Sequence, residues 1–168
     1  IQMNIIGFPI GKNDQYAASF GGINVYMIDT QGEVIVAPLY IPNLERLKEH
    51  SVLFFTGYSR NANKILEVQK NKIEELKLMH QLSYAIKYAL TEGKFDVFGE
   101  LMNEHWKYKK KVSPEVTNPQ IDYWYDTALK HGAIGGKLIG AGGGGFLLFY
   151  TNDPEKLIQK MTVEGLKH

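Results

Sequence analysis

The chain has 168 residues, of which 44% are hydrophobic and 22% charged, with a formal net charge of +1 and no cysteine. This composition is typical of a globular domain with a real core, and it excludes a disulfide framework, thiolate chemistry and a strongly basic nucleic-acid-binding protein. No apolar run is long enough for a membrane span, no signal-peptide pattern occurs, and the five histidines lack metal-ligand spacing. We therefore expect a cytoplasmic protein without nucleic-acid, membrane or metal partners in this chain.

The first stretch with chemical potential is "PIGKNDQYAASFGG", residues 9–22. Small residues after Asp14 predict a short, tightly packed helix that Gly21 and Gly22 bring to an end. Asp14 would then lie near the helix N-terminus, where the helix dipole favours a carboxylate by roughly 0.3–1 kcal/mol. Such an Asp could accept a hydroxyl proton or orient a cation. The alternative is that Asp14 only caps the helix and Lys12 is a solvated flank.

The next part of the chain alternates between strand and helix patterns. Residues 23–28 and 33–41 are rich in β-formers and flank "DTQGE", which predicts a hairpin. After a short connector, "SVLFFTG" (51–57) predicts a fully buried strand. Apolar residues from 61 to Gly93 follow a helical period, with a break expected near Asn71.

The C-terminal part of the chain continues with helices around one strand pair. Spacing from Phe95 to His105 predicts a helix, and the basic run "KYKKK" (107–111) at its polar end indicates a solvated face. A proline-bearing loop precedes a helix over 120–132 that should end at its final glycine. Asp153 is expected to cap the last helix. This order of elements predicts an α+β fold, with helices on one face of a sheet.

The stretch "GKLIGAGGGGFLLFY", residues 136–150, belongs to a run with seven glycines in the eleven positions from Gly135 to Gly145. A dinucleotide fingerprint would have to open a helix, but "FLLFY" is a strand pattern. A protein-kinase loop would need HRD and DFG signatures, and a Walker loop needs Ser or Thr after Lys137. The remaining interpretations are a flexible hairpin connection or an anion-binding nest of backbone N–H groups. We favour the nest, because four consecutive glycines indicate close approach of a bulky group, most often phosphate.

Together these stretches resemble a known family of small-molecule kinases. "KLIGAGGGGFLLFY" is similar to the C-terminal motif of the GHMP family, which groups galactokinase, homoserine kinase, mevalonate kinase and phosphomevalonate kinase. "GKNDQYAASFGG", "FTGYSRNANKIL" and "NPQIDYWYDTALKHGAIGG" look like its branch of D-glycero-D-manno-heptose 7-phosphate kinases. Two departures are Phe8, where an acid is expected, and Asn13, where glutamine is expected. Asn13 could alter a substrate contact.

The resemblance implies an architecture for the chain. The family's main ATP loop, of "GLGSS" type, lies upstream of the Asp14 stretch and has no counterpart here, so the chain resembles the C-terminal half of a two-domain kinase. Residues 1–50 would end the N-terminal kinase domain. Residues 51–168 would form the C-terminal domain, a ferredoxin-like antiparallel sheet with helices on one face.

The resemblance also implies a function. The parent protein would be an ATP- and Mg²⁺-dependent sugar kinase that phosphorylates the anomeric hydroxyl of heptose 7-phosphate, with metal ligands in the part that precedes this chain. Asp14 would be the catalytic aspartate, and Lys12 and Arg60 would contact the sugar phosphate. The backbone that would approach the nucleotide phosphates consists of Gly140, Ala141, Gly142, Gly143 and Gly144. The 168 residues alone are expected to be inactive. The alternatives are a kinase for fucose or galactose and a non-catalytic sensor of sugar and nucleotide.

Overall fold

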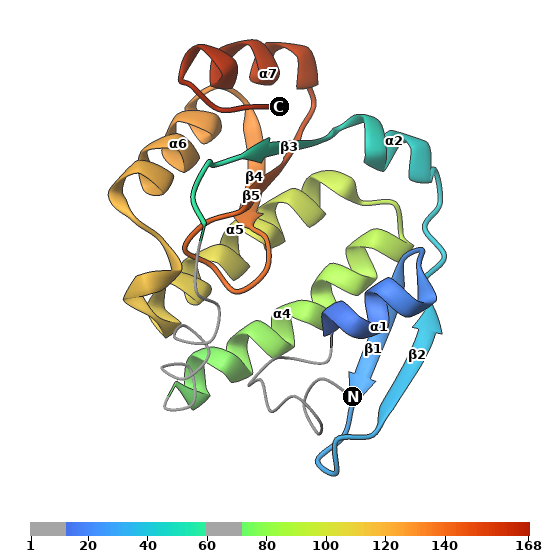
Figure 1. Cartoon of the computed structure of the whole chain (residues 1–168). Helices are drawn as coiled ribbons and strands as arrows, with labels where there is room; N and C mark the ends of the chain where they lie inside the picture. Colours follow the sequence, from blue (N-terminus) through green and yellow to red (C-terminus); the bar gives the residue numbers. More distant parts are fainter. Residues whose placement is uncertain (1–12, 60–71) are drawn as a thin grey trace.

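The computed structural model describes residues 13–59 and 72–168 (Figure 1). The N-terminal elements are α1 (Asn13–Phe20), β1 (Asn24–Ile28), β2 (Val34–Pro38), α2 (Leu44–Glu49) and β3 (Ser51–Phe55). After the undescribed stretch come α4 (Ile73–Thr91), α5 (Phe95–Val112), the short 3₁₀ helix η2 (Pro114–Val116) and α6 (Pro119–Lys130). The chain continues with β4 (Ala133–Leu138), β5 (Phe146–Thr151) and α7 (Pro154–Val163). No helix within the described ranges is long and apolar enough to cross a bilayer.

Helix α1 and the β1–β2 hairpin form a small unit at one end of the molecule (Figure 1). Asp14 lies in the first turn of α1, as the sequence predicted, and both glycines that follow the helix have positive φ. The hairpin turns at Asp29, whose Oδ1 accepts hydrogen bonds from the N–H groups of Gln31 and Glu33. The predicted hairpin is therefore confirmed, although its second strand is shorter than the expected 33–41.

The second sheet has the strand order β3-β5-β4, with every neighbouring pair antiparallel. Because side chains alternate across a strand, β5 contributes to both faces of this sheet. Leu147 and Phe149 join the larger apolar cluster, whereas Leu148 and Tyr150 pack into a second cluster on the other face.

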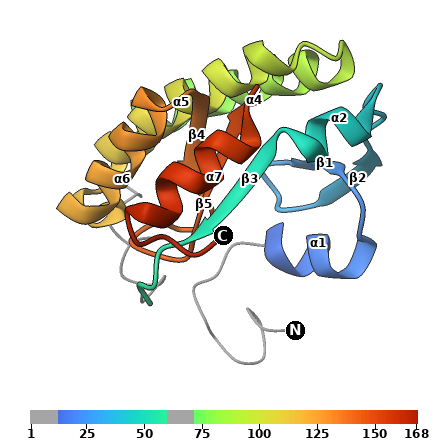
Figure 2. The ribbon, with the colours of Figure 1, turned by 90° about the horizontal axis from the view of Figure 1, so that it is seen from above.

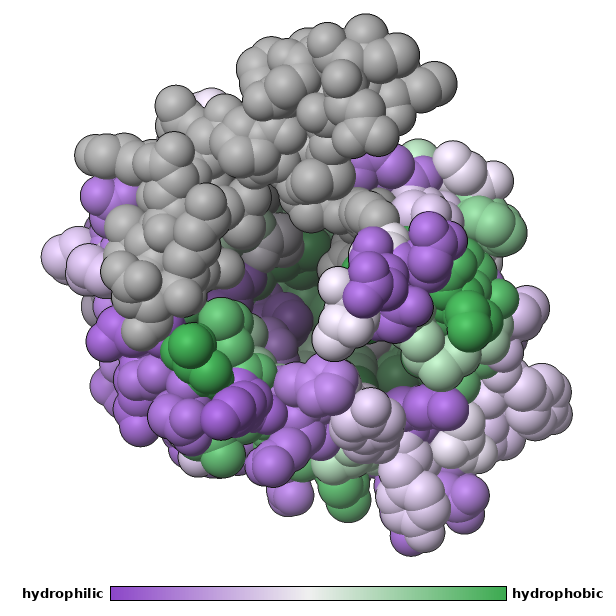
Figure 3. Space-filling model, turned by 90° about the horizontal axis from the view of Figure 1, so that it is seen from below, coloured by the Kyte–Doolittle hydropathy of each residue, from purple (hydrophilic) through white to green (hydrophobic). Residues whose placement is uncertain are grey.

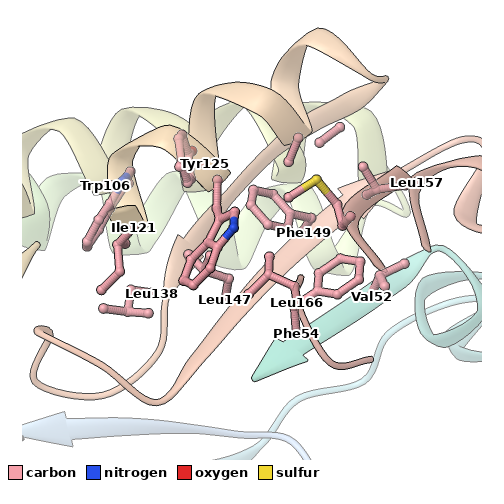
Figure 4. Close-up of a cluster of buried hydrophobic side chains, with 14 of the residues drawn as sticks. Val52, Phe54, Trp106, Ile121, Tyr125, Leu138, Leu147, Phe149, Leu157 and Leu166 are labelled. Carbon is pink, nitrogen blue, oxygen red and sulfur yellow. The ribbon is translucent and has the colours of Figure 1, made fainter. Parts of the chain in front are cut away.

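The larger cluster lies between this sheet and the helices α6 and α7 (Figure 4). It is built from fully or almost fully buried side chains of several elements, among them Val52, Phe54, Trp106, Ile121, Tyr125, Leu138, Leu147, Phe149, Leu157 and Leu166. Each such side chain contributes roughly 1.5–3 kcal/mol by leaving water. This cluster is therefore the main core, and it holds the β4–β5 pair rigidly in place.

The second cluster makes the sheet more fully covered than the sequence predicted. Helices on one face were expected, and α6 and α7 form that layer. However, Phe95 and Met102 of α5, together with Leu47 of α2, pack with Tyr150 on the opposite side. Helix α5 is able to contact both clusters because it is long and runs beside the edge strand β4.

Strand β3 corrects a second expectation. The apolar run 51–57 predicted a fully buried strand, but only alternate residues are buried: Leu53 is 45% exposed and Phe55 is 39% exposed. An all-apolar run is compatible with burial on one face or on both, so hydropathy alone could not decide between them.

The ends of the helices follow the capping signals in the sequence. The Asp153 side chain accepts the Lys156 N–H at 3.1 Å at the start of α7, as predicted. Asn118 caps α6 in the same way through the Ile121 N–H at 2.9 Å. Gly132 follows the C-terminus of α6 with φ +103°, which confirms the predicted glycine stop.

Candidate functional site

The segment that joins β4 to β5, residues 139–145, is here called the glycine turn. Four of its residues have positive φ: Gly140 (77°), Gly142 (116°), Gly143 (74°) and Gly145 (93°). Residues with a Cβ adopt such values at a cost of roughly 1–2 kcal/mol each, so a sequence without glycine could not follow this path. The predicted order of strand, glycine loop and strand is confirmed.

Hydrogen bonds fix the glycine turn to two distant parts of the chain. The Gly143 N–H donates to Val116 O at 2.6 Å, and the Gly145 N–H donates to Tyr58 O at 3.1 Å. Gly145 O in turn accepts both the backbone N–H and the hydroxyl of Thr56. The turn is therefore an anchored structure and not a flexible connection.

The close approach that the glycines permit is made by the chain's own backbone. A Cβ at Gly142 would lie 2.8 Å from the Val116 Cα, and a Cβ at Gly144 would meet Tyr58 O. The sequence interpretation assigned this approach to phosphate. That inference needs correction, because at least Gly142 and Gly144 are required by internal packing, whatever ligand the turn binds.

Lys109 lies directly beneath the glycine turn. Its Nζ donates hydrogen bonds to Leu138 O at 3.3 Å and to Gly140 O, and the residue is only 7% exposed. The prediction of a solvated face for 107–111 is therefore wrong at this position, although Lys107 and Lys111 are exposed. A signal was available in the sequence, since Lys109 falls three residues after the buried Trp106 and continues the buried stripe of α5.

A second buried lysine lies close to this region. Lys137 on β4 places its Nζ 3.5 Å from His105 Nδ1 on α5. Burial lowers the pKa of Lys137. Burial, followed by the nearby ammonium groups of Lys137 and Lys109, lowers the pKa of His105 to about 3. His105 is thus neutral at physiological pH, and basic side chains gather behind the glycine turn.

The orientation of the peptide groups in the turn follows from these contacts. In a trans peptide the C=O and the next N–H point in opposite directions, and the described residues contain no cis peptide bond. Because Gly140 O faces Lys109, the Ala141 N–H points away from that side chain. Within residues 13–59 and 72–168 this N–H has no hydrogen-bond acceptor. Ala141 is half-buried and Gly140 is exposed, so the turn presents a backbone donor near its surface.

The other site residues predicted from the sequence are not brought to this turn within the described residues. Asp14 is exposed on α1, and the ribbons of α1 and the glycine turn lie apart in both views (Figures 1 and 2). Lys12 and Arg60 lie outside the described residues. No group of three or more His, Asp or Glu side chains in the described ranges could hold a metal ion.

The surface also contains a groove that none of the predicted site residues lines. It has a volume of about 490 Å³ and runs between β1 and α4, with Tyr26, His80, Tyr84 and Lys87 among its lining residues. Seen from below, the molecule is hollowed near its centre, with hydrophobic surface inside the hollow and hydrophilic residues around it (Figure 3).

The fold and the glycine turn agree with a family comparison. Residues 86–166 match the family model described as "GHMP kinases C terminal". The chain therefore contains the C-terminal domain of a GHMP kinase, a family whose members use ATP and Mg²⁺. Its α+β fold of antiparallel sheets and helices is that of the C-terminal halves of these kinases, as the sequence predicted.

Individual relatives narrow the comparison. The chain is 36% identical over 164 residues to the D-glycero-alpha-D-manno-heptose 7-phosphate kinase of Campylobacter jejuni, which covers 93% of this chain and 48% of that protein. It is 28% identical to the bifunctional fucokinase/GDP-fucose pyrophosphorylase of Arabidopsis thaliana, over 84% of this chain and 14% of that protein. A crystal structure of a D-glycero-D-manno-heptose 1-phosphate kinase from Bacteroides thetaiotaomicron has a TM-score of 0.71 and 27% identity, covering 96% of this chain and 45% of that one. The chain thus spans about half the length of both heptose kinases.

Proposed function

We propose that the protein containing this chain is an ATP-dependent sugar kinase whose acceptor is the anomeric hydroxyl of D-glycero-D-manno-heptose 7-phosphate. The observation that carries the proposal is the 36% identity to a heptose 7-phosphate kinase, because it extends over 93% of the chain and is not limited to one motif. Sugar and ATP would be its partners, and a cytoplasmic location belongs to the same proposal because ATP is the phosphoryl donor.

In this proposal the glycine turn contributes to the phosphate side of the site. Gly140, Ala141 and Gly143 lie at or near the surface of the turn, and the Ala141 N–H is directed away from the Lys109 side chain. A preorganised backbone N–H of this kind stabilises negative charge without having to reorient during the reaction. Gly142 and Gly144 are buried and act by letting the turn pack on Val116 and Tyr58. The described residues do not fit a Mg²⁺ site, so no step is assigned to metal here.

Asp14 is proposed to serve the acceptor hydroxyl, either by accepting its proton or by offsetting the charge that develops on oxygen. Lys12 and Arg60 would contact the sugar phosphate, since a guanidinium can bind a phosphate through two parallel hydrogen bonds. Replacing Asp14 with Asn in the full-length protein should lower kcat by roughly 10²–10⁴-fold, the usual contribution of a positioned acid–base group. Asp126→Asn, at an exposed position on α6, is the control. A loss below threefold in Asp14→Asn would remove Asp14 from the reaction.

The chain is also proposed to combine parts of two domains, with the boundary near residue 50. The β1–β2 pair belongs to a different sheet from β3-β5-β4, and α2 connects the two sheets. Residues 1–50 would complete an N-terminal domain, and residues 51–168 would form the C-terminal one. Because phosphoryl transfer needs a phosphate cradle and a metal as well as an acceptor site, these 168 residues alone should not bind ATP tightly or turn over.

The acceptor can be determined with the full-length protein and a panel of sugars. The names of the two heptose kinase relatives place the phosphate at different positions, C7 and C1. ADP release should therefore be measured with heptose 7-phosphate, heptose 1-phosphate, L-fucose and D-galactose, and the product position assigned by ³¹P NMR. We expect heptose 7-phosphate to be used best and to yield the 1,7-bisphosphate. Preference for fucose would favour the relationship to fucokinase. Nucleotide and sugar binding without ADP release would indicate a sensor.

A further inference from the structure

The basic run 107–111 contains one lysine whose environment differs from that of its neighbours. Lys107 pairs with Glu104 at 2.5 Å on the surface, and Lys110 pairs with Asp122 at 3.1 Å where both side chains are about one-third exposed. Lys109 instead points into the protein and donates to two backbone carbonyls, Leu138 O and Gly140 O. Burial of an ammonium group costs free energy unless it is well hydrogen-bonded, so an apolar residue here would suit a purely structural position.

The two carbonyls that Lys109 holds are placed at the beginning of the glycine turn. One belongs to the last residue of β4 and the other to the first glycine of the turn, so the ammonium fixes two peptide planes around Ile139. The N–H of Ile139 is bonded to Phe146 O at 2.9 Å, within the strand pair. The N–H of Ala141, in the second of these planes, is the one left to face outward.

Resting on the proposed function, we propose that Lys109 is a positioning residue for the nucleotide phosphates. By holding Leu138 O and Gly140 O toward α5, it turns the Ala141 N–H outward to donate to a phosphate oxygen, and it places a positive charge directly behind that peptide. Lys109 does not touch the phosphate itself. The contacts of Gly143 with Val116 and of Gly145 with Tyr58 fix the far end of the turn, and Lys109 fixes the near end.

The first test is kinetic and uses the full-length protein. Lys109→Met keeps the apolar stem and removes the ammonium, and Lys109→Arg keeps the charge. The matched control is Lys107→Met, which removes an exposed lysine from the same helix. We expect KM for ATP to rise by about 10- to 100-fold in Lys109→Met, the scale of a lost charged hydrogen bond, while KM for the sugar changes by less than about threefold. Lys109→Arg should recover part of the loss. A KM for ATP equal to that of Lys107→Met would overturn the proposal.

The second test does not depend on catalysis. Amide hydrogen exchange, followed by mass spectrometry, should show faster exchange for peptides spanning 139–146 in Lys109→Met, with unchanged exchange in α7. Faster exchange throughout the protein would show a merely structural role, and unchanged exchange in the turn would show no role. Either result overturns the proposal. Should Lys109→Met fail to fold, Lys109→Gln, which keeps an N–H donor without charge, replaces it in both tests. A wild-type protein without kinase activity would refute the proposed function, yet the exchange comparison would still decide whether Lys109 sets the turn.

Discussion

A single methyl group on Gly135 should separate helix α5 from strand β4. A Cβ built at Gly135 would overlap the backbone oxygen of Gly99 on α5, and it would lie 2.7 Å from the Gly99 carbonyl carbon. It would also come within 3.0 Å of Asn103 Cβ. The main obstacle is backbone in the middle of a long helix, which cannot rotate out of the way as a side chain could. Gly135→Ala therefore requires α5 and β4 to move apart.

The size of the effect follows from what that movement disturbs. Overpacking in a core costs about 1–3 kcal/mol when side chains can adjust, and more when backbone must shift. Since α5 contributes side chains to both apolar clusters, we expect Gly135→Ala to lose about 3 kcal/mol or more. For a domain of this size, this corresponds to a fall in Tm of roughly 6–12 °C.

Gly99→Ala is the matched control, because it adds the same methyl to the facing residue. Its Cβ would lie 3.0 Å from Ile134 Cγ2 and 3.2 Å from Tyr150 Cδ1, which are side-chain atoms. Alanine also gains up to about 1 kcal/mol of helix propensity over glycine. The net change should stay within about 1 kcal/mol. Urea unfolding followed by circular dichroism would measure both variants in the full-length protein. If Gly135→Ala unfolds at the wild-type urea midpoint, the close approach of β4 to α5 is wrong.

Three further predictions concern pH, a helix cap and the turn. The folded pKa of His105, about 3, lies below its model value of 6.5, so the unfolded state takes up the proton first as the pH falls. Stability from this group is therefore present above pH 6.5 and lost toward pH 3; urea titrations at pH 7.5 and 5.5 should show wild type losing about 1 kcal/mol more than His105→Gln, and equal losses would contradict this. Asp153→Ala should destabilise by about 1 kcal/mol by removing the cap on the Lys156 N–H, whereas Asp153→Asn should cost much less in the same measurement. Gly142→Ala, at φ +116° and against Val116, should lower Tm and also kcat/KM for ATP in the full-length protein; wild-type values for both would show that the turn does not need this glycine.

The parts of the fold that sequence could predict are those that depend on neighbours along the chain. Asp153 before a proline and Gly132 after an apolar helix are local signals, and both mark real helix ends. The hairpin at Asp29 is equally local, because its turn is closed by its own side chain. Such features need no knowledge of tertiary packing, and the sequence therefore places them correctly.

The environment of Lys109 was missed for a different physical reason. Lysine is among the residues least often buried, so a run of lysines at the end of a helix indicates solvent. What buries Lys109 is the pair of carbonyls at residues 138 and 140, about thirty positions further along the chain. The helical period alone did put Lys109 on the buried stripe after Trp106, and in this case periodicity was the better guide than polarity.

The glycine turn shows why a motif can be recognised before its glycines are understood. Their number suggested a backbone bared for phosphate, but Val116 and Tyr58 occupy the space beside Gly142 and Gly144. Neither partner can be inferred from spacing, since Tyr58 lies more than eighty residues before the turn. If part of the motif is needed for internal packing, a protein that had lost its nucleotide would still retain those glycines. The glycine pattern therefore identifies the fold more securely than the activity, and the orientation of the Ala141 N–H by Lys109 is the feature that would distinguish a working phosphate site from an inherited turn.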